Sequence, residues 1–213
     1  MKEKTKKITL TAIGIFFITF GIFAMDFSIY RSNWGWVLWL CYWGMIIIGF
    51  GILTKNSYLI LSQLNMLAIP LIFWNIDFFY FLIKKKSLWG ISDYFFSEMM
   101  KAARFISLEH IFLIPLSIFA LYFIKIKRTD AWKLSIIQTI IFFTLSRFFT
   151  NQNDNVNFVF YSPISIIPTN SWYLLKWFII SNMAILLTNF LIIKIPGIKN
   201  FSQTKITFNK LNN

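Results

Sequence analysis

Long apolar stretches dominate the sequence, and polar segments separate them. Six stretches approach the roughly 20 apolar residues that an α-helix needs to cross a bilayer. They lie at about residues 8–25, 34–53, 57–83, 105–126, 131–150 and 171–194. Because lipid cannot satisfy backbone hydrogen bonds, spanning segments of this kind fold as helices. The pattern therefore predicts an all-α fold, a polytopic membrane bundle of about six transmembrane helices.

The connections between these stretches are short, with two exceptions. Residues 84–104 join the third and fourth stretches, and residues 151–170 join the fifth and sixth. No Gly/Ser-rich linker and no internal repeat divides the chain. We expect a single transmembrane helical domain over residues 1–194, followed by a polar C-terminal tail, 195–213, that frays.

Composition excludes an ordinary soluble protein. Hydrophobic residues make up 57% of the chain and charged residues only 14%, whereas soluble domains carry about 25% charged residues. The formal net charge is +13, but the basic residues gather between the apolar stretches, as membrane insertion and anionic lipid favour. We therefore expect membrane lipids as partners and no nucleic acid, and protein partners remain unknown.

The N-terminal segment and the basic residues predict how the chain sits in the membrane. Residues 1–25 resemble a signal peptide, but the apolar part is long and no clear cleavage site precedes Asp26, so we interpret it as a retained span. The distribution of Lys and Arg favours a cytoplasmic N-terminus. The lysines at 84–86 oppose it, unless residues 88–100 form a helix in the interface. We expect a multi-pass protein of a cell membrane, most simply a bacterial cytoplasmic membrane.

Several polar side chains fall at one membrane depth. With about 1.5 Å per helical residue, Cys41 lies roughly 10 Å and Asp77 roughly 9 Å below the same surface, and Glu109 and His110 lie roughly 6–8 Å deep. Arg147 is slightly shallower, and Asn155 and Asn157 follow in the next loop. Ionisable groups in a membrane usually face the bundle interior and form pairs. We expect a polar pocket in one leaflet, with Arg147 paired to Asp77 or Glu109.

Each of these residues has a structural and a functional interpretation. Cys41 is either a packed small side chain or a nucleophile that His110 activates. His110 either bonds a neighbouring helix or acts as a general base. Asp77, Glu109 and Arg147 either form structural ion pairs or bind a substrate headgroup. The asparagines at 155 and 157 either cap a turn or contact substrate.

The sequence predicts neither a metal nor a cofactor. Cys41 and His110 are the single cysteine and the single histidine. An intrachain disulfide is therefore impossible, and a zinc site built from the usual Cys and His ligands is not expected. No phosphate-binding Gly-rich loop and no Gly-x-Ser-x-Gly or His-Glu-x-x-His motif occurs.

Two segments resemble a known family. The first reads His110-Ile-Phe-Leu-Ile-Pro115 and precedes Gln138-Thr139, and the second, Asn155-Val-Asn-Phe-Val-Phe160, follows Thr150. Together they resemble a family of uncharacterised bacterial integral membrane proteins with His-x-Phe-Leu-x-Pro and Asn-[Ile/Val]-Asn-[Trp/Phe]-Val-Phe segments. That family carries no assigned activity.

A more distant resemblance does imply an activity. Leu40-Cys41, Leu53-Thr-Lys-Asn56 and His110, with the asparagine-rich loop, resemble the YwaF-like membrane proteins. Those are similar to transmembrane acyltransferases that move fatty acyl chains between glycerolipids with a cysteine and a histidine. The resemblance implies Cys41 as acyl acceptor and His110 as its base. Trp39 and Glu109 differ from the family pattern.

Three functions stay open from the sequence. The first is lipid acyl transfer or hydrolysis by a Cys41–His110 pair. The second is a non-enzymatic lipid-binding or accessory role. The third is a small transporter, which would need a polar path through the other leaflet, where Gln63, Asn65 and Gln138 are the candidates.

Overall fold

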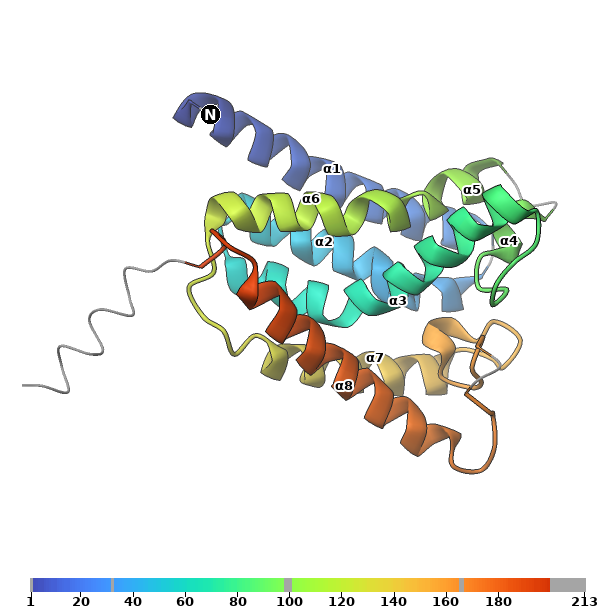
Figure 1. Ribbon diagram of the computed structural model, residues 1–213. Coiled ribbons are helices and arrows are strands. Elements are labelled where there is room, and N and C mark those ends of the chain that lie inside the picture. The colour runs from blue at the N-terminus through green and yellow to red at the C-terminus, as the bar shows by residue number, and fades with distance from the viewer. Residues whose placement is uncertain (1, 32, 98–100, 165–166, 200–213) are drawn as a thin grey trace, which may run out of the picture.

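The computed structural model describes residues 2–31, 33–97, 101–164 and 167–199, which form helices and loops with no named β-strand among them (Figure 1). The elements are α1 (Glu3–Tyr30), the 3-10 helix η1 (Trp34–Leu38), α2 (Leu40–Leu53), α3 (Ser57–Lys84), α4 (Asp93–Phe96), α5 (Lys101–Ser107), α6 (Glu109–Ile124), α7 (Trp132–Phe149), the 3-10 helix η2 (Val156–Phe158) and α8 (Tyr173–Lys194).

Length and hydropathy mark four helical segments as able to cross a membrane: α1, α3, the combined segment Lys101–Ile124 and α8. Helix α2 is apolar but has only 14 residues, which is about 21 Å and short for a bilayer core. Since η1 directly precedes α2, the two together cover the predicted stretch 34–53. All six predicted stretches are mainly helical, and the prediction of an all-α membrane helical bundle is confirmed.

Large apolar side chains cover the outer surface of the bundle. Ile15 of α1, Ile72 of α3 and Leu186 of α8 are all exposed, and each is one of many such residues. A soluble protein rarely leaves so much contiguous apolar surface open to water. The exposed apolar faces are therefore the surfaces that lipid covers.

Two glycines allow α1 and α2 to approach closely. A Cβ atom at Gly49 would lie 2.6 Å from the Gly14 carbonyl oxygen, and a Cβ atom at Gly14 would lie 3.1 Å from the Gly49 carbonyl oxygen. Neither contact leaves room for a side chain, and a backbone oxygen cannot move aside as a side chain can. Small residues at helix contacts are the usual basis of close packing in membranes.

Replacing Gly49 with valine is therefore expected to separate α1 from α2. We expect the free energy of unfolding to fall by about 1–3 kcal/mol, the usual cost of overpacking. Thermal unfolding in one detergent measures this. Ala12→Val is the matched control, because Ala12 is exposed on α1 and extra methyl groups there enter lipid. Equal effects of the two substitutions would contradict the packing role of Gly49.

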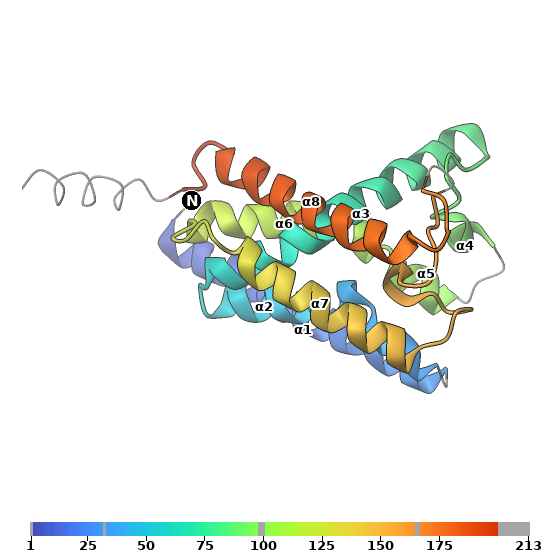
Figure 2. The ribbon, with the colours of Figure 1, turned by 90° about the horizontal axis from the view of Figure 1, so that it is seen from below.

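The two ends of the bundle differ in structure. The start of α1 and the end of α8 lie at one end, and α4 and α5 lie at the opposite end (Figures 1 and 2). The start of the C-terminal tail is ordered against the first end: Ile126 N–H donates to the Ile198 carbonyl at 2.8 Å, and Ile198 is fully buried. The expected fraying is thus wrong for residues 195–199, and residues 200–213 lie outside the described part.

The connection between α3 and α5 contains less helix than expected. A short interfacial helix over residues 88–100 is one interpretation of the sequence, because it would shelter the lysines at 84–86. The structure instead has a turn followed by α4, which contains four residues, and residues 98–100 lie outside the described residues. Asp77 of α3 causes the difference, because its carboxylate holds the backbone of the turn. Its Oδ1 accepts from Leu88 and Trp89 N–H, both at 2.8 Å.

Candidate functional site

The second predicted span is interrupted, and the interruption positions Cys41. Trp39 has an extended conformation between η1 and α2 (φ −58°, ψ 124°), so α2 begins inside the apolar stretch and Cys41 is its second residue. Asn157 bridges the gap: its Oδ1 accepts from Leu40 N–H at 3.0 Å, and its Nδ2 donates to the Leu38 carbonyl at 2.8 Å. One side chain thereby satisfies backbone groups that the break would leave unpaired in a membrane.

A second interruption positions His110. Leu108 separates α5 from α6, and Ile111 N–H donates only three residues back, to the Leu108 carbonyl at 3.0 Å. The Ser107 carbonyl faces His110 Nδ1 at 2.6 Å. Because a carbonyl can only accept, Nδ1 carries the proton and donates it. The unprotonated lone pair of the neutral ring is therefore on Nε2.

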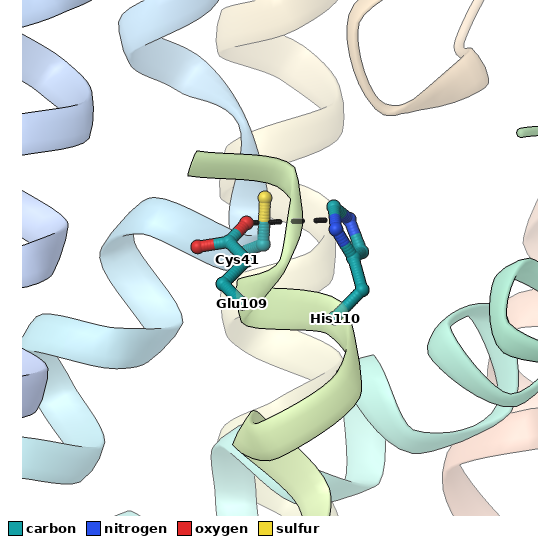
Figure 3. Close-up of side chains that lie close together, drawn as sticks. All are labelled: Cys41, Glu109 and His110. Atoms are coloured by element: carbon teal, nitrogen blue, oxygen red, sulfur yellow. Dashed lines mark ion pairs between the residues drawn. The ribbon is translucent and has the colours of Figure 1, made fainter. Parts of the chain in front are cut away.

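Cys41, Glu109 and His110 form one cluster, which Figure 3 shows between α2 and the start of α6. The Cys41 sulfur, a Glu109 oxygen and a His110 ring nitrogen all lie within 4.8 Å of one another. Glu109 Oε1 is 4.0 Å from His110 Nε2. Glu109 is 0% exposed and Cys41 is 8% exposed. Cys41 and His110, which were expected at one membrane depth, thus lie next to each other.

The Glu109 carboxyl group is unusual because its oxygens accept no hydrogen bond in the described structure, although the Cys41 thiol and His110 Nε2 lie nearby. Both of its oxygens are buried and have no hydrogen-bond partner there. Buried polar groups nearly always have such a partner, and an exception calls for an explanation such as a catalytic role or a bound ion. A buried carboxyl group without a partner costs about 1–3 kcal/mol.

Aromatic and amide side chains hold the His110 ring in place. The Trp74 indole stacks on it with 4.6 Å between ring centroids and 20° between planes. Trp74 Nε1 donates to the Tyr94 hydroxyl of α4 at 2.9 Å. Asn75 Nδ2 donates to the His110 carbonyl at 2.7 Å. Sequence reasoning did not single out Trp74, Asn75 or Tyr94 as supports of the site.

The expected ion pairs of Arg147 are wrong. Arg147 donates to the Val159 carbonyl at 3.4 Å, and its guanidinium lies 4.4 Å from the centre of the Phe160 ring. Among the described residues, neither Asp77 nor Glu109 forms an ion pair with it. The reason is that the turn after α3 satisfies Asp77, and Glu109 points toward Cys41 and His110.

The two asparagines of the loop bind backbone groups. Asn155 Oδ1 accepts from the N–H groups of Phe160 and Tyr161, and its Nδ2 donates to the Tyr161 carbonyl at 2.9 Å. Asn157 bridges η1 and α2 and donates to Ser146 Oγ at 2.9 Å. The capping interpretation of this loop is therefore confirmed, and Asn157 also links the loop to the helix that carries Cys41.

The polar residues of the other leaflet bond to one another. Gln63 Nε2 donates to Gln138 Oε1 at 2.9 Å. Asn65 Nδ2 donates to Ser135 Oγ at 3.3 Å and to Asn189 Oδ1 at 3.1 Å. These bonds join α3 to α7 and α8, so the polar groups proposed for a transport path connect helices instead.

No family model, curated protein or solved structure matches this chain. The family resemblances of the two sequence segments stay predictions.

Proposed function

We propose that this protein transfers or hydrolyses acyl groups of membrane-lipid esters, with Cys41 as nucleophile and His110 as base. The observation that supports the proposal most strongly is the buried cluster of a thiol, an imidazole with a free Nε2 and a carboxyl group, all within 4.8 Å. Cys41 lies in the first turn of α2, where the helix dipole offsets part of the cost of forming a thiolate in a buried site.

The proposed reaction has two steps, acylation of Cys41 and transfer of the acyl group from it. Cys41 gives its proton to His110 Nε2, and the sulfur attacks the ester carbonyl carbon. The intermediate collapses, and the leaving glycerol oxygen takes the proton from His110, which yields a lysolipid and a thioester on Cys41. Water or a second lipid hydroxyl then gives its proton to His110 and attacks the thioester. The Cys41 thiolate leaves and regains the proton. Glu109, 4.0 Å from Nε2, stabilises the charged imidazolium.

An open apolar groove supports lateral entry of an acyl chain. It is a shallow, open depression of about 440 Å³ on the surface of α3, and its lining residues, all on that helix, are Ile72, Asn75, Ile76, Phe79, Tyr80 and Ile83. Asn75 connects it to the cluster, because the same side chain donates to the His110 carbonyl. In this proposal the groove holds the chain and Asn75 lies between chain and catalytic ring.

Exposed groups near the membrane surface complete the proposed substrate site. Arg147 is exposed at the end of α7, where a lipid phosphate would give its guanidinium a charged partner. With the N-terminus on the cytoplasmic side of a bacterial membrane, the cluster would lie in the outer leaflet. The substrate would then be an outer-leaflet glycerolipid.

Trapping of the thioester tests the proposal. Purified protein in nanodiscs that contain a phospholipid with an alkyne-tagged acyl chain is expected to acquire a hydroxylamine-sensitive label on Cys41. Cys41→Ala removes it, and His110→Ala slows it about 10²–10⁴-fold, as loss of a general base does. Ser117→Ala is the control, because Ser117 is buried in α6 and donates to the Leu113 carbonyl within its own helix. Labelling that persists in Cys41→Ala would refute the proposal.

The groove also favours a second candidate, a lipid-binding protein without catalysis. In that case the tagged phospholipid copurifies with the protein, no thioester forms, and Cys41→Ala leaves lipid retention unchanged. A bulky residue in the groove, Ile76→Trp, would instead reduce retention.

A further inference from the structure

We infer that Cys41, Glu109 and His110 form a binding site for one divalent transition-metal ion of the Zn²⁺ type, and that the bound metal and the free thiol exclude each other. The inference uses the residues of the proposed function but does not require acyl transfer. One cysteine and one histidine alone do not predict a zinc site, but Glu109 offers a carboxylate as the third ligand.

The three donor atoms are those that Zn²⁺ prefers. A thiolate sulfur, an imidazole nitrogen and a carboxylate oxygen bind Zn²⁺ at about 2.0–2.3 Å, so tetrahedral donors lie about 3.5 Å apart. The donors here lie within 4.8 Å of one another. Side-chain movements of about 1 Å would bring them to the separation that a bound Zn²⁺ requires. The sulfur ligand disfavours Mg²⁺ and Ca²⁺, which take oxygen ligands.

The surroundings of His110 match those of a metal ligand. Metal-binding histidines usually donate their second ring N–H to a carbonyl or carboxylate, which fixes the tautomer and aims the other nitrogen at the metal. His110 Nδ1 does this with the Ser107 carbonyl at 2.6 Å. Trp74 stacks on the ring and restrains its rotation. Nε2, which lies 4.0 Å from Glu109 Oε1, is therefore available to a cation.

The buried carboxyl group of Glu109 is a second observation that points to a bound cation. Glu109 is fully buried, both of its oxygens are unpaired, and no Lys or Arg among the described residues forms an ion pair with it. Once both groups ionise to bind a cation, a thiolate and a carboxylate this close would repel each other without it. A divalent cation would compensate both charges and provide the partner that the Glu109 oxygens lack. Three protein ligands leave a fourth position open, as in catalytic zinc sites.

Metal binding has a direct chemical consequence for Cys41. The sulfur lone pair that would attack an ester or an alkylating reagent forms the bond to the metal. Zn²⁺ is therefore expected to protect Cys41 from alkylation and to inhibit any reaction that requires its thiolate. Chelation of the metal restores reactivity, because no covalent change has occurred.

The experiment uses tag-free, chelator-treated full-length protein in nanodiscs. Titration with Co²⁺ is expected to produce a sulfur-to-metal charge-transfer band that saturates at one ion per chain, and excess Zn²⁺ removes it. Glu109→Gln and His110→Ala each weaken the affinity by about 10-fold or more, and Cys41→Ser abolishes the band. Asp26→Asn is the control, since Asp26 is an exposed carboxylate of α1 outside the cluster.

Alkylation of Cys41 gives a second readout. Zn²⁺ should slow maleimide modification in the parent protein and in Asp26→Asn, but not in Glu109→Gln. Thermal unfolding confirms that each variant is folded. The inference is overturned if no charge-transfer band appears, or if Glu109→Gln and His110→Ala bind Co²⁺ as the parent does. Acyl labelling of the metal-free protein is measured separately, so failure of the catalytic proposal and failure of the metal site give different results.

Discussion

Replacing Asn157 with alanine is expected to lower the free energy of unfolding by about 3–5 kcal/mol and to disorganise the start of α2. The substitution removes the acceptor of Leu40 N–H and the donor to the Leu38 carbonyl and Ser146 Oγ. Each buried group left without a partner costs about 1–3 kcal/mol. Lipid cannot replace the lost bonds, in contrast to water at the surface of a soluble protein.

Thermal unfolding and maleimide modification of Cys41 measure the two consequences of Asn157→Ala. We expect a lower unfolding midpoint and a Cys41 that no longer depends on His110 for its reactivity, because the first turn of α2 moves. Asn182→Ala is the matched control. Asn182 donates to the Phe178 carbonyl in its own helix. That carbonyl keeps its backbone hydrogen bond when the Asn182 side chain is removed, so Asn182→Ala costs much less. A stability of Asn157→Ala equal to that of Asn182→Ala would contradict the bridging role.

The common membrane depth of Cys41, Glu109 and His110 could be predicted because it depends on two simple quantities. Successive membrane helices alternate in direction, and each residue adds about 1.5 Å of depth, so the three residues had to reach one leaflet. Which side chains touch depends on helix rotation and on local breaks. The helix breaks at Trp39 and at Leu108 do not occur at prolines, and the apolar sequence pattern continues through both of them.

The interruption at Trp39 shows why the rest could not be predicted. Hydropathy describes 34–53 as one span, but the backbone there bonds to Asn157, which lies more than 100 residues later. Asn157 itself has a left-handed conformation, with φ at 53°, which asparagine tolerates better than most residues. The sequence shows only an asparagine-rich loop, whether or not that loop bonds to the backbone at Trp39. Only the three-dimensional path of that loop shows that it completes a helix.

Asp77 illustrates the same limit for charged residues. Depth alone suggested Arg147 as its partner, since an ionised group in a membrane needs compensation. Backbone N–H groups supply that compensation instead, because residues 87–92 turn back over the end of α3. Four hydrogen bonds to one carboxylate make an opposite charge unnecessary. The turn has no apolar periodicity, so its path left no signal in the sequence pattern.

Asp77→Asn is therefore expected to be the second most damaging substitution, with a loss of about 2–4 kcal/mol in the free energy of unfolding. Asparagine has nearly the same shape but replaces one acceptor oxygen with an NH₂ group. That group would face either the Leu88 and Trp89 N–H groups or those of Ser92, at positions where Asp77 now accepts at 2.8–2.9 Å. Donors would then face donors, and the turn would detach from α3.

Hydrogen exchange of the backbone distinguishes this local effect from general destabilisation. In Asp77→Asn, amides of residues 87–96 should exchange much faster, while those of α1 and α8 change less. Asp93→Asn is the control, because Asp93 is exposed and accepts a side-chain bond only from Ser87 Oγ at 3.3 Å. Since the segment carries Tyr94, which bonds Trp74 beside His110, the freed turn should also weaken Co²⁺ binding at the cluster. Unchanged exchange in the turn would show that Asp77 does not hold it.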